Sequence, residues 1–155
     1  MFEKELLKYK ITGCFIFAPN EELRLKCNAP TSTDCGGIYC IYDMTDGKDD
    51  LLYIGSSGQR DKNREFKGRK SGLGGMKDRI VNGYHPKLEH DENSKRIKRH
   101  KAFPLLMKSE GIKQVRICWY ITYDGKDYFD FPTDVEKALL EDYRVYHNRK
   151  PQWHK

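Results

Sequence analysis

The clearest periodic pattern in the chain is the alternation of side chains over residues 115–123, VRICWYITY. Because side chains alternate between the two faces of a strand, this pattern predicts a β-strand. One face carries Val115, Ile117, Trp119 and Ile121. The other face holds Cys118 and Tyr120 beside its polar residues, so we expect a central strand of a sheet.

Two further β-rich runs, GIYCIYDM at 37–44 and LLYIGSS at 51–57, flank an Asp-Gly dipeptide. An Asp-Gly between two such runs is a strong signal for a β-hairpin. The hairpin would bring Tyr39 close to Tyr53. The two tyrosines share a face only if paired positions have an even sum, in the absence of a bulge.

The last periodic segment, TDVEKALLEDYRVYHN at 133–148, predicts a helix that begins at Pro132-Thr133. Its apolar stripe consists of Val135, Leu139, Tyr143 and Tyr146. Glu136 lies at the edge of this stripe, where a carboxylate needs a cation, a donor or a metal ion. Glu136 also has capping-box spacing from Thr133, so a cap and a functional carboxylate both remain open.

Three other segments complete the predicted elements. Residues 76–82, MKDRIVN, predict a short helix that ends at Gly83. Residues 94–110 have a helical composition, but Pro104 must start a new segment or kink one. An Asp-Gly after the alternating strand predicts that residues 127–131 fold back as an extra strand.

The chain length of 155 residues indicates one domain. The fold class predicted is α+β, with a small central antiparallel sheet of about three strands flanked by helices. Residues 1–35 end in a turn-rich stretch and are expected as an N-terminal extension packed on the domain of residues 36–155.

A net charge of +6 points toward a polyanionic partner. The positive charge is concentrated in two stretches. The candidate DNA-binding residues in these stretches are Lys67, Arg69, Lys70, Lys95, Arg96, Lys98 and Arg99. The alternative is that both stretches are ordinary solvated surface, and Lys67 and Lys70 taken singly fit that better.

Five cysteines form an odd set with no C-x-x-C pair, which argues against a disulfide framework and for a reducing cytoplasm. No apolar run approaches the roughly 20 residues that a membrane span needs, so no membrane partner is expected.

The tripeptides Gly37–Tyr39 and Tyr53–Gly55 read G-I-Y and Y-I-G, and their tyrosines are fourteen residues apart. Arg79 on a predicted helix, Glu136 opening a later helix and Asn148 twelve residues after it follow in order. In this combination the chain resembles the GIY-YIG nucleases. Either tripeptide alone is weak, whereas the five elements in order are specific.

The resemblance covers about residues 36–151. One position departs from the family pattern, which usually has a histidine or tyrosine four residues after the arginine. Gly83 occupies that position, and Tyr84 or His85 would supply the group if the helix ended early. His147 is a further candidate because it falls near the glutamate on the helical wheel.

The resemblance implies a role for each matching residue. Glu136 would bind Mg²⁺, with Mn²⁺ as a substitute, and Arg79 would hold the scissile phosphate. A tyrosine would be the general base, although ionising a free phenol at neutral pH costs about 4 kcal/mol. We favour Tyr39 as the base, with Tyr53 orienting water or phosphate and Asn148 supporting the site from behind.

The function predicted is therefore a metal-dependent DNA endonuclease, most simply a small type II restriction-like enzyme. A repair or structure-specific nuclease of the same family is one alternative. A nucleic-acid-binding module that has lost catalysis is another. A homodimer is expected if the enzyme cuts both strands, and the preference for DNA over RNA is open.

Overall fold

A computed structural model describes residues 2–155 of the chain. The main sheet has the strand order β1-β6-β2-β3, and each strand is antiparallel to its neighbours. Its strands are β1 (Thr12–Phe17), β2 (Gly36–Asp43), β3 (Asp50–Ser57) and β6 (Val115–Tyr123). A separate ribbon pairs β4 (Gln59–Arg60) with β5 (Phe66–Lys67). The α+β prediction is confirmed, with four strands in the main sheet where about three were expected.

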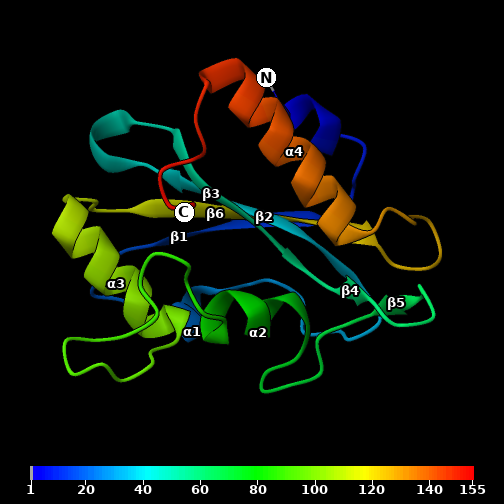
Figure 1. The fold of residues 1–155 in the computed structure, drawn as a ribbon, viewed down its shortest axis with the longest axis horizontal. Coiled ribbons are helices and arrows are strands. Elements are labelled where there is room, and N and C mark those ends of the chain that lie inside the picture. Colours follow the sequence, from blue (N-terminus) through cyan, green and yellow to red (C-terminus); the bar gives the residue numbers. More distant parts are fainter. Residues whose placement is uncertain (1) are drawn as a thin grey trace.

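Helices cover both faces of the main sheet (Figure 1). One face carries α4 (Pro132–His147) and the short η1 (Phe2–Leu6). The other face carries α1 (Leu23–Lys26), α2 (Gly75–Asn82) and α3 (Arg99–Glu110). The sheet therefore lies between two apolar layers, and the strands β2 and β6 at its centre are buried on both sides.

The predicted hairpin is confirmed, with η2 (Thr45–Gly47) in the turn between β2 and β3. Tyr39 pairs with Gly55 and Ile41 pairs with Tyr53, so the paired positions have an even sum. Both tyrosines consequently lie on the face toward α2 and α3. A bulge follows beyond Ile41, which leaves this register intact at the tyrosines.

The helices α3 and α4 differ from the predictions in detail, and the expected extra strand differs as well. α2 ends at Gly83 as expected, but α3 begins at Arg99, later than the composition suggested, and contains Pro104 within it. α4 begins at Pro132, yet Tyr146 is 84% exposed and does not face the sheet. The expected extra strand is reduced to one isolated bridge, between Tyr123 and Phe129.

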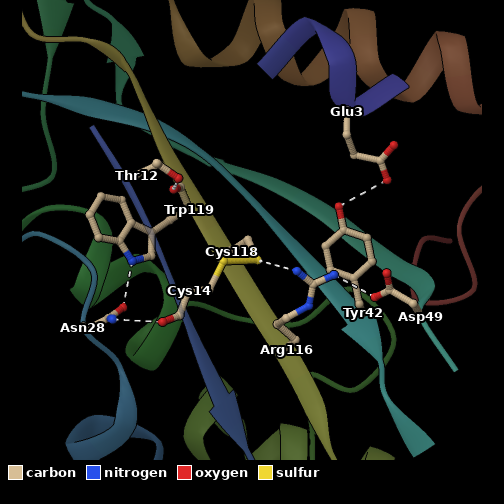
Figure 2. The surroundings of a disulfide bond; sticks show 9 residues. All are labelled: Glu3, Thr12, Cys14, Asn28, Tyr42, Asp49, Arg116, Cys118 and Trp119. Atoms are coloured by element: carbon tan, nitrogen blue, oxygen red, sulfur yellow. Dashed lines mark hydrogen bonds and ion pairs between the residues drawn. A yellow bond between two sulfur atoms is a disulfide. The ribbon is translucent and has the colours of Figure 1, made fainter. Parts of the chain in front are cut away.

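Strand β1 is the main element missing from the predictions, although Cys14, Phe15, Ile16 and Phe17 form a short apolar run that is compatible with a strand. It pairs with β6 at the edge of the sheet and makes Cys14 the direct partner of Cys118. These two cysteines form a disulfide (Figure 2), contrary to the expectation of reduced cysteines. The cysteines therefore do not indicate a reducing compartment.

The same edge of the sheet is tied to its neighbours by side-chain hydrogen bonds. Asn28 donates to the carbonyl of Cys14 and accepts from the indole of Trp119 (Figure 2). On the other side of the disulfide, Arg116 donates to Asp49 over 2.7 Å.

Within the described part of the chain, none of the helices has both the length and the apolar character needed to cross a bilayer.

Candidate active site

The two signature tyrosines lie side by side, with their ring centroids 6.1 Å apart. Gly55 lies opposite Tyr39 on the neighbouring strand, and a Cβ at position 55 would overlap the phenol ring of Tyr39. Gly37 is equally restricted, since a Cβ there would overlap the backbone carbonyl of Tyr120 in β6. The glycines of the two tripeptides thus have a steric reason: they let the strands and the phenol of Tyr39 pack closely.

A buried guanidinium joins the two phenols. Arg99, the first residue of α3, has no exposed surface and donates hydrogen bonds to the hydroxyls of Tyr39 and Tyr53. It also donates to the carbonyl oxygen of Arg79 over 3.2 Å. Burial opposes the positive charge, but the phenol oxygens outweigh this effect and raise the pKa of Arg99 above its ordinary value.

The burial of Arg99 overturns its predicted role as a surface residue that contacts DNA. The sequence contained a signal for this burial. Arg99 precedes Ala102 and Phe103 by three and four residues, and Leu106 follows at the next turn, so all four share the buried face of α3. The helical phase of Arg99 therefore distinguishes it from the exposed basic residues that precede it.

His85 lies in the same aromatic cluster, as one of the two candidates for the position after Arg79. Its ring is fully buried against Tyr53, Phe103 and Trp153, with centroid separations of 5.6, 5.6 and 5.1 Å. The Nδ1 atom accepts a hydrogen bond from a backbone N–H, which leaves the proton of the neutral ring on Nε2. Burial, and to a smaller extent the charge of Arg99, lowers the pKa of His85 to about 3.

The C-terminal residues close the free edge of β3 next to Tyr53. The ring of His154 stacks on Tyr53 with centroids 4.3 Å apart, and its Nε2 accepts a hydrogen bond from the backbone N–H of Ile54. The N–H of Trp153 donates to the carbonyl of Leu52 over 2.8 Å. No local pattern in the sequence indicates this role for His154, because the contact joins residues one hundred positions apart.

Glu136 makes a tertiary contact and does not cap its own helix. Helix α4 has no side-chain hydrogen bond at its N-cap among the described residues. Instead, Glu136 accepts a hydrogen bond from the hydroxyl of Ser56 over 2.5 Å. Burial raises the pKa of Glu136, whereas Ser56, Arg79 and Arg99 lower it. The carboxylate is therefore half-buried within electrostatic range of both arginines.

Arg79 lines a hollow of about 460 Å³ at the end of β3. Lys67 and Lys70 line the same hollow, and within residues 2–155 no ion pair neutralises either lysine or Arg79. The hydroxyl of Ser57 is buried at this hollow and has no hydrogen-bond partner in the described chain. Unpaired cations beside a free hydroxyl donor suit a phosphate group.

Arg69 also lines this hollow, but its guanidinium is paired with a carboxylate. It donates to the carboxylate of Asp78 over 2.6 Å, and Asp78 accepts further hydrogen bonds from Leu73 and Asn82. Burial alone would raise the pKa of Asp78, but these hydrogen bonds outweigh it and lower the pKa. Asp78 therefore fixes the loop that carries Lys67 and Lys70.

Sheet geometry explains how the acid and the phenols meet. Ser56 and Glu136 lie on the α4 side of the edge strand β3, whereas Tyr53 lies on the α2 side. Arg79 lies on α2, on the tyrosine side of the sheet, and Tyr53 is within electrostatic range of both Arg79 and Glu136. Tyr39, Tyr53, Arg79 and Glu136 therefore lie in one region of the sheet, with the carboxylate on the face opposite the phenols.

Other predicted residues lie elsewhere. Asn148 is the exposed left-handed residue that ends α4, sixteen residues of helix away from its start near Glu136. His147 stacks on Tyr143 at that same far end, and the ring of Tyr84 lies 3.5 Å from the guanidinium carbon of Arg96. The roles predicted for Asn148, His147 and Tyr84 at the site are therefore not supported by their positions.

The second basic stretch is also separate from the site. Lys95, Arg96 and Lys98 are exposed in the segment before α3, which lies at the opposite end of the molecule from the β4–β5 ribbon (Figure 1). Lys67, Arg69 and Lys70 lie next to that ribbon. The predicted DNA-binding residues thus divide into a group beside the candidate site and a group remote from it.

Solvent exposure distinguishes the two phenols. Tyr39 has no exposed surface, whereas Tyr53 is 7% exposed. This contradicts our preference for Tyr39 as the phenol that meets water directly. Burial, together with the neighbouring Tyr39, raises the pKa of Tyr53 to about 12, and Arg99 acts in the opposite direction.

The donor set also bears on the expected metal ion. Across residues 2–155, no three or more His, Cys, Asp or Glu side chains gather as a ready-made metal site. A single half-buried carboxylate next to a hollow is compatible with Mg²⁺, which keeps most of its water ligands.

Comparison with protein-family models, curated protein sequences and solved structures found no match to this chain.

Proposed function

We propose that this protein is a metal-dependent DNA endonuclease of the GIY-YIG type. The observation that carries the proposal is the convergence of Tyr39, Tyr53, Arg79 and Glu136 around the end of β3. These residues come from four separate segments of the chain. A purely structural role for the sequence pattern would not require Arg79 to line a hollow with unpaired lysines beside Ser56, the hydrogen-bond partner of Glu136.

In this proposal the scissile phosphate occupies the hollow at Arg79. The guanidinium of Arg79 can donate two parallel hydrogen bonds to the phosphate oxygens, and Lys67 and Lys70 add positive charge. The free hydroxyl of Ser57 supplies one more donor. These groups offset the negative charge that builds on phosphorus as water attacks.

Tyr53 is the phenol that we assign to proton acceptance, because it is 7% exposed whereas Tyr39 has no exposed surface. Tyr53 first loses its proton to solvent. As the phenolate it takes a proton from water while the new oxygen–phosphorus bond forms and the bond to the leaving oxygen breaks; the leaving oxygen is protonated from solvent. Arg99 stabilises the phenolate with a positive charge already in contact with the hydroxyl. Tyr39 shares the same guanidinium and keeps it oriented.

Glu136 would hold the Mg²⁺ ion, which when bound supplies Lewis-acid stabilisation of a phosphate oxygen. Ser56 orients the carboxylate by its hydrogen bond. The raised pKa of Glu136 means that the carboxylate form is lost at a higher pH than for an exposed glutamate. As the pH falls, metal binding should accordingly begin to weaken at a higher pH than it would with an exposed glutamate.

The test is cleavage of supercoiled plasmid with Mg²⁺ or Mn²⁺, against an EDTA control. We expect nicked or linear product, and a loss of about 100-fold or more in Glu136→Gln and in Arg79→Ala. Glu141→Gln is the matched control, because Glu141 lies on the same helix but is exposed and paired with Arg144. Full activity in Glu136→Gln would refute the proposal. Discrete duplex fragments would indicate a restriction enzyme, whereas preferred cleavage of flaps or junctions would indicate a repair enzyme.

Two observations favour a second candidate, a nucleic-acid-binding module without catalysis. Tyr39 is sealed from solvent, and Gly83 stands where the family has a histidine or tyrosine. This candidate predicts salt-dependent DNA binding without cleavage in Mg²⁺, Mn²⁺ or Ca²⁺. The plasmid assay therefore separates the two functions.

For the compartment, we retain the cytoplasm as part of this proposal, because the proposed DNA substrate is found there. The Cys14–Cys118 disulfide is the observation that favours an oxidising compartment instead. Trapping thiols with an alkylating reagent at cell lysis tests the point. Two alkylated cysteines at positions 14 and 118 would support the cytoplasm, whereas a protected pair would oppose it.

A further inference from the structure

The β4–β5 ribbon is an element that the proposed chemistry does not use. It begins two residues after β3 ends, with Gly58 at a φ of +105° between them. Gln59 pairs with Lys67 and Arg60 with Phe66 in an antiparallel register. The ribbon makes no strand pairing with the main sheet and extends from one end of the molecule (Figure 1).

The base of the ribbon is held rigidly. The ring of Phe66 stacks on Tyr123 with centroids 4.4 Å apart, at the end of strand β6. Arg60 lies 4.0 Å from the ring centroid of Phe131 and donates to both carboxylate oxygens of Asp134, over 3.0 and 2.5 Å. The ribbon is therefore anchored to β6 and to the start of α4, which carries Glu136.

The tip of the ribbon is an ordered turn with free side chains. Asp61 accepts hydrogen bonds from the backbone N–H groups of Asn63 and Glu65, over 2.8 and 3.0 Å. Lys62, Asn63 and Arg64 are exposed, and within residues 2–155 their side chains make no hydrogen bond or ion pair. A fixed backbone with unengaged polar side chains is suited to contacts with another molecule.

Two adjoining hollows that share lysines link the ribbon to the candidate site. A hollow of about 760 Å³ along the ribbon is lined by Lys62 and Asn63. It shares Lys67 and Lys70 with the hollow that contains Arg79. A polyanion held at Arg79 would therefore continue along the ribbon toward its tip.

The surface fits a duplex better than a single strand. Single-strand sites stack bases on free aromatic rings, but Phe66 and Phe131 at this ribbon are already covered by Tyr123 and Arg60. The major groove of B-form DNA, about 12 Å wide, admits a two-stranded ribbon. The major groove of an RNA duplex is too deep and narrow for side chains to read.

We infer that the β4–β5 ribbon enters the major groove of duplex DNA, with Asn63 and Arg64 contacting base edges. Asparagine pairs well with adenine and arginine with guanine in this groove. Lys62, Lys67 and Lys70 contact the phosphates on either side. The inference rests on the proposed DNA substrate, and it assigns sequence recognition to a defined nine-residue segment, residues 59–67.

The test is selection from a randomised DNA duplex library in EDTA, where no cleavage occurs, followed by sequencing of the bound fraction. The wild-type protein should enrich a short motif. Asn63→Ala and Arg64→Ala should each remove the preference at one or two positions and weaken binding to the motif by at least about fivefold. Lys67→Ala should weaken binding to all sequences alike and reduce the salt dependence by about one ion.

The chain offers a matched control in the turn at residues 91–95. Asp91 accepts hydrogen bonds from the N–H groups of Asn93 and Lys95, both over 2.9 Å, as Asp61 does in the ribbon. Asn93→Ala should leave the selected motif unchanged. The inference is overturned if the wild type enriches no motif, if both ribbon-tip variants select the wild-type motif, or if single-stranded DNA or duplex RNA competes better than duplex DNA. Selective binding without cleavage in Mg²⁺ would refute the nuclease and leave the ribbon's role standing.

Discussion

Arg99 donates a hydrogen bond from its buried guanidinium to the hydroxyl of Tyr39. The same guanidinium reaches Tyr53, and among residues 2–155 no carboxylate forms an ion pair with it. A buried cation surrounded by neutral phenols is unusual, because desolvation of a charge is costly without a counter-charge. Ionisation of one phenol would complete the pair, which is the property that a tyrosine base needs.

Replacement of Arg99 by methionine should impair catalysis through the phenol. The charge of Arg99 lowers the pKa of Tyr53, so Arg99→Met should raise that pKa and lower cleavage at pH 8 by about tenfold or more. Because the phenolate is the active form and the pKa is about 12, cleavage should rise nearly tenfold per pH unit between pH 7 and 9. Plasmid cleavage rates across this range provide the measurement.

Arg99→Lys is the control, since it retains the positive charge and should recover most of the lost rate. The ¹³Cζ chemical shift of labelled tyrosine gives a second readout that a merely structural role would leave unchanged. Equal rates and equal tyrosine titration in Arg99→Met and wild type would contradict this role for Arg99.

Acid should destabilise the fold through His85. Burial lowers its pKa to about 3, whereas the unfolded value is near 6.5, so the unfolded state binds more protons between these values. The stability from the neutral ring is complete above pH 6.5 and is lost as the pH falls toward 3. Urea unfolding at pH 7 and pH 5 should show a decrease of about 2 kcal/mol from His85 alone.

His85→Phe should remove this part of the pH dependence, because phenylalanine fits among Tyr53, Phe103 and Trp153 without titrating. The exposed His90→Phe serves for comparison and should keep the wild-type dependence. A His85→Phe protein that loses stability in acid as steeply as wild type would show that His85 is not the responsible group.

Gly55→Ala should destabilise the hairpin by displacing Tyr39. The added methyl group overlaps the phenol ring, and overpacking of this kind costs about 1–3 kcal/mol in the free energy of unfolding. Chemical denaturation measures the effect. The cost should largely vanish when Tyr39→Ala is present as well. Ser57→Ala, two residues along the same strand face, should change stability little; a similar loss there would argue against the specific overlap.

Loss of the Cys14–Cys118 disulfide should lower the free energy of unfolding by about 2–4 kcal/mol, because it closes a long loop of 104 residues. Cys14→Ser/Cys118→Ser and reduction of the wild type should have equal effects. Cys35→Ser removes an unbonded cysteine and should have little effect. A count of five reactive thiols in the denatured, unreduced protein would contradict the disulfide; three are expected.

The sequence by itself determined the elements that repeat with a short period. The alternation in β6 and the Asp-Gly hairpin predicted the central strands, and the parity of the pairing placed Tyr39 and Tyr53 on one face once the register was known. The start of α4 and the end of α2 followed from local signals at Pro132 and Gly83. Local backbone preferences are sufficient for these features.

Only the tertiary structure decided which distant groups meet. Cys14 pairs with Cys118 because β1 joins the edge of the sheet beside β6, and no local signal in the sequence specifies that pairing. Glu136 accepts a hydrogen bond from Ser56 and does not cap the helix. Arg99 is buried against the two phenols and is not part of the basic surface. Each of these contacts depends on free energies of burial and of packing between distant segments. Neighbouring residues in the sequence carry no information about them.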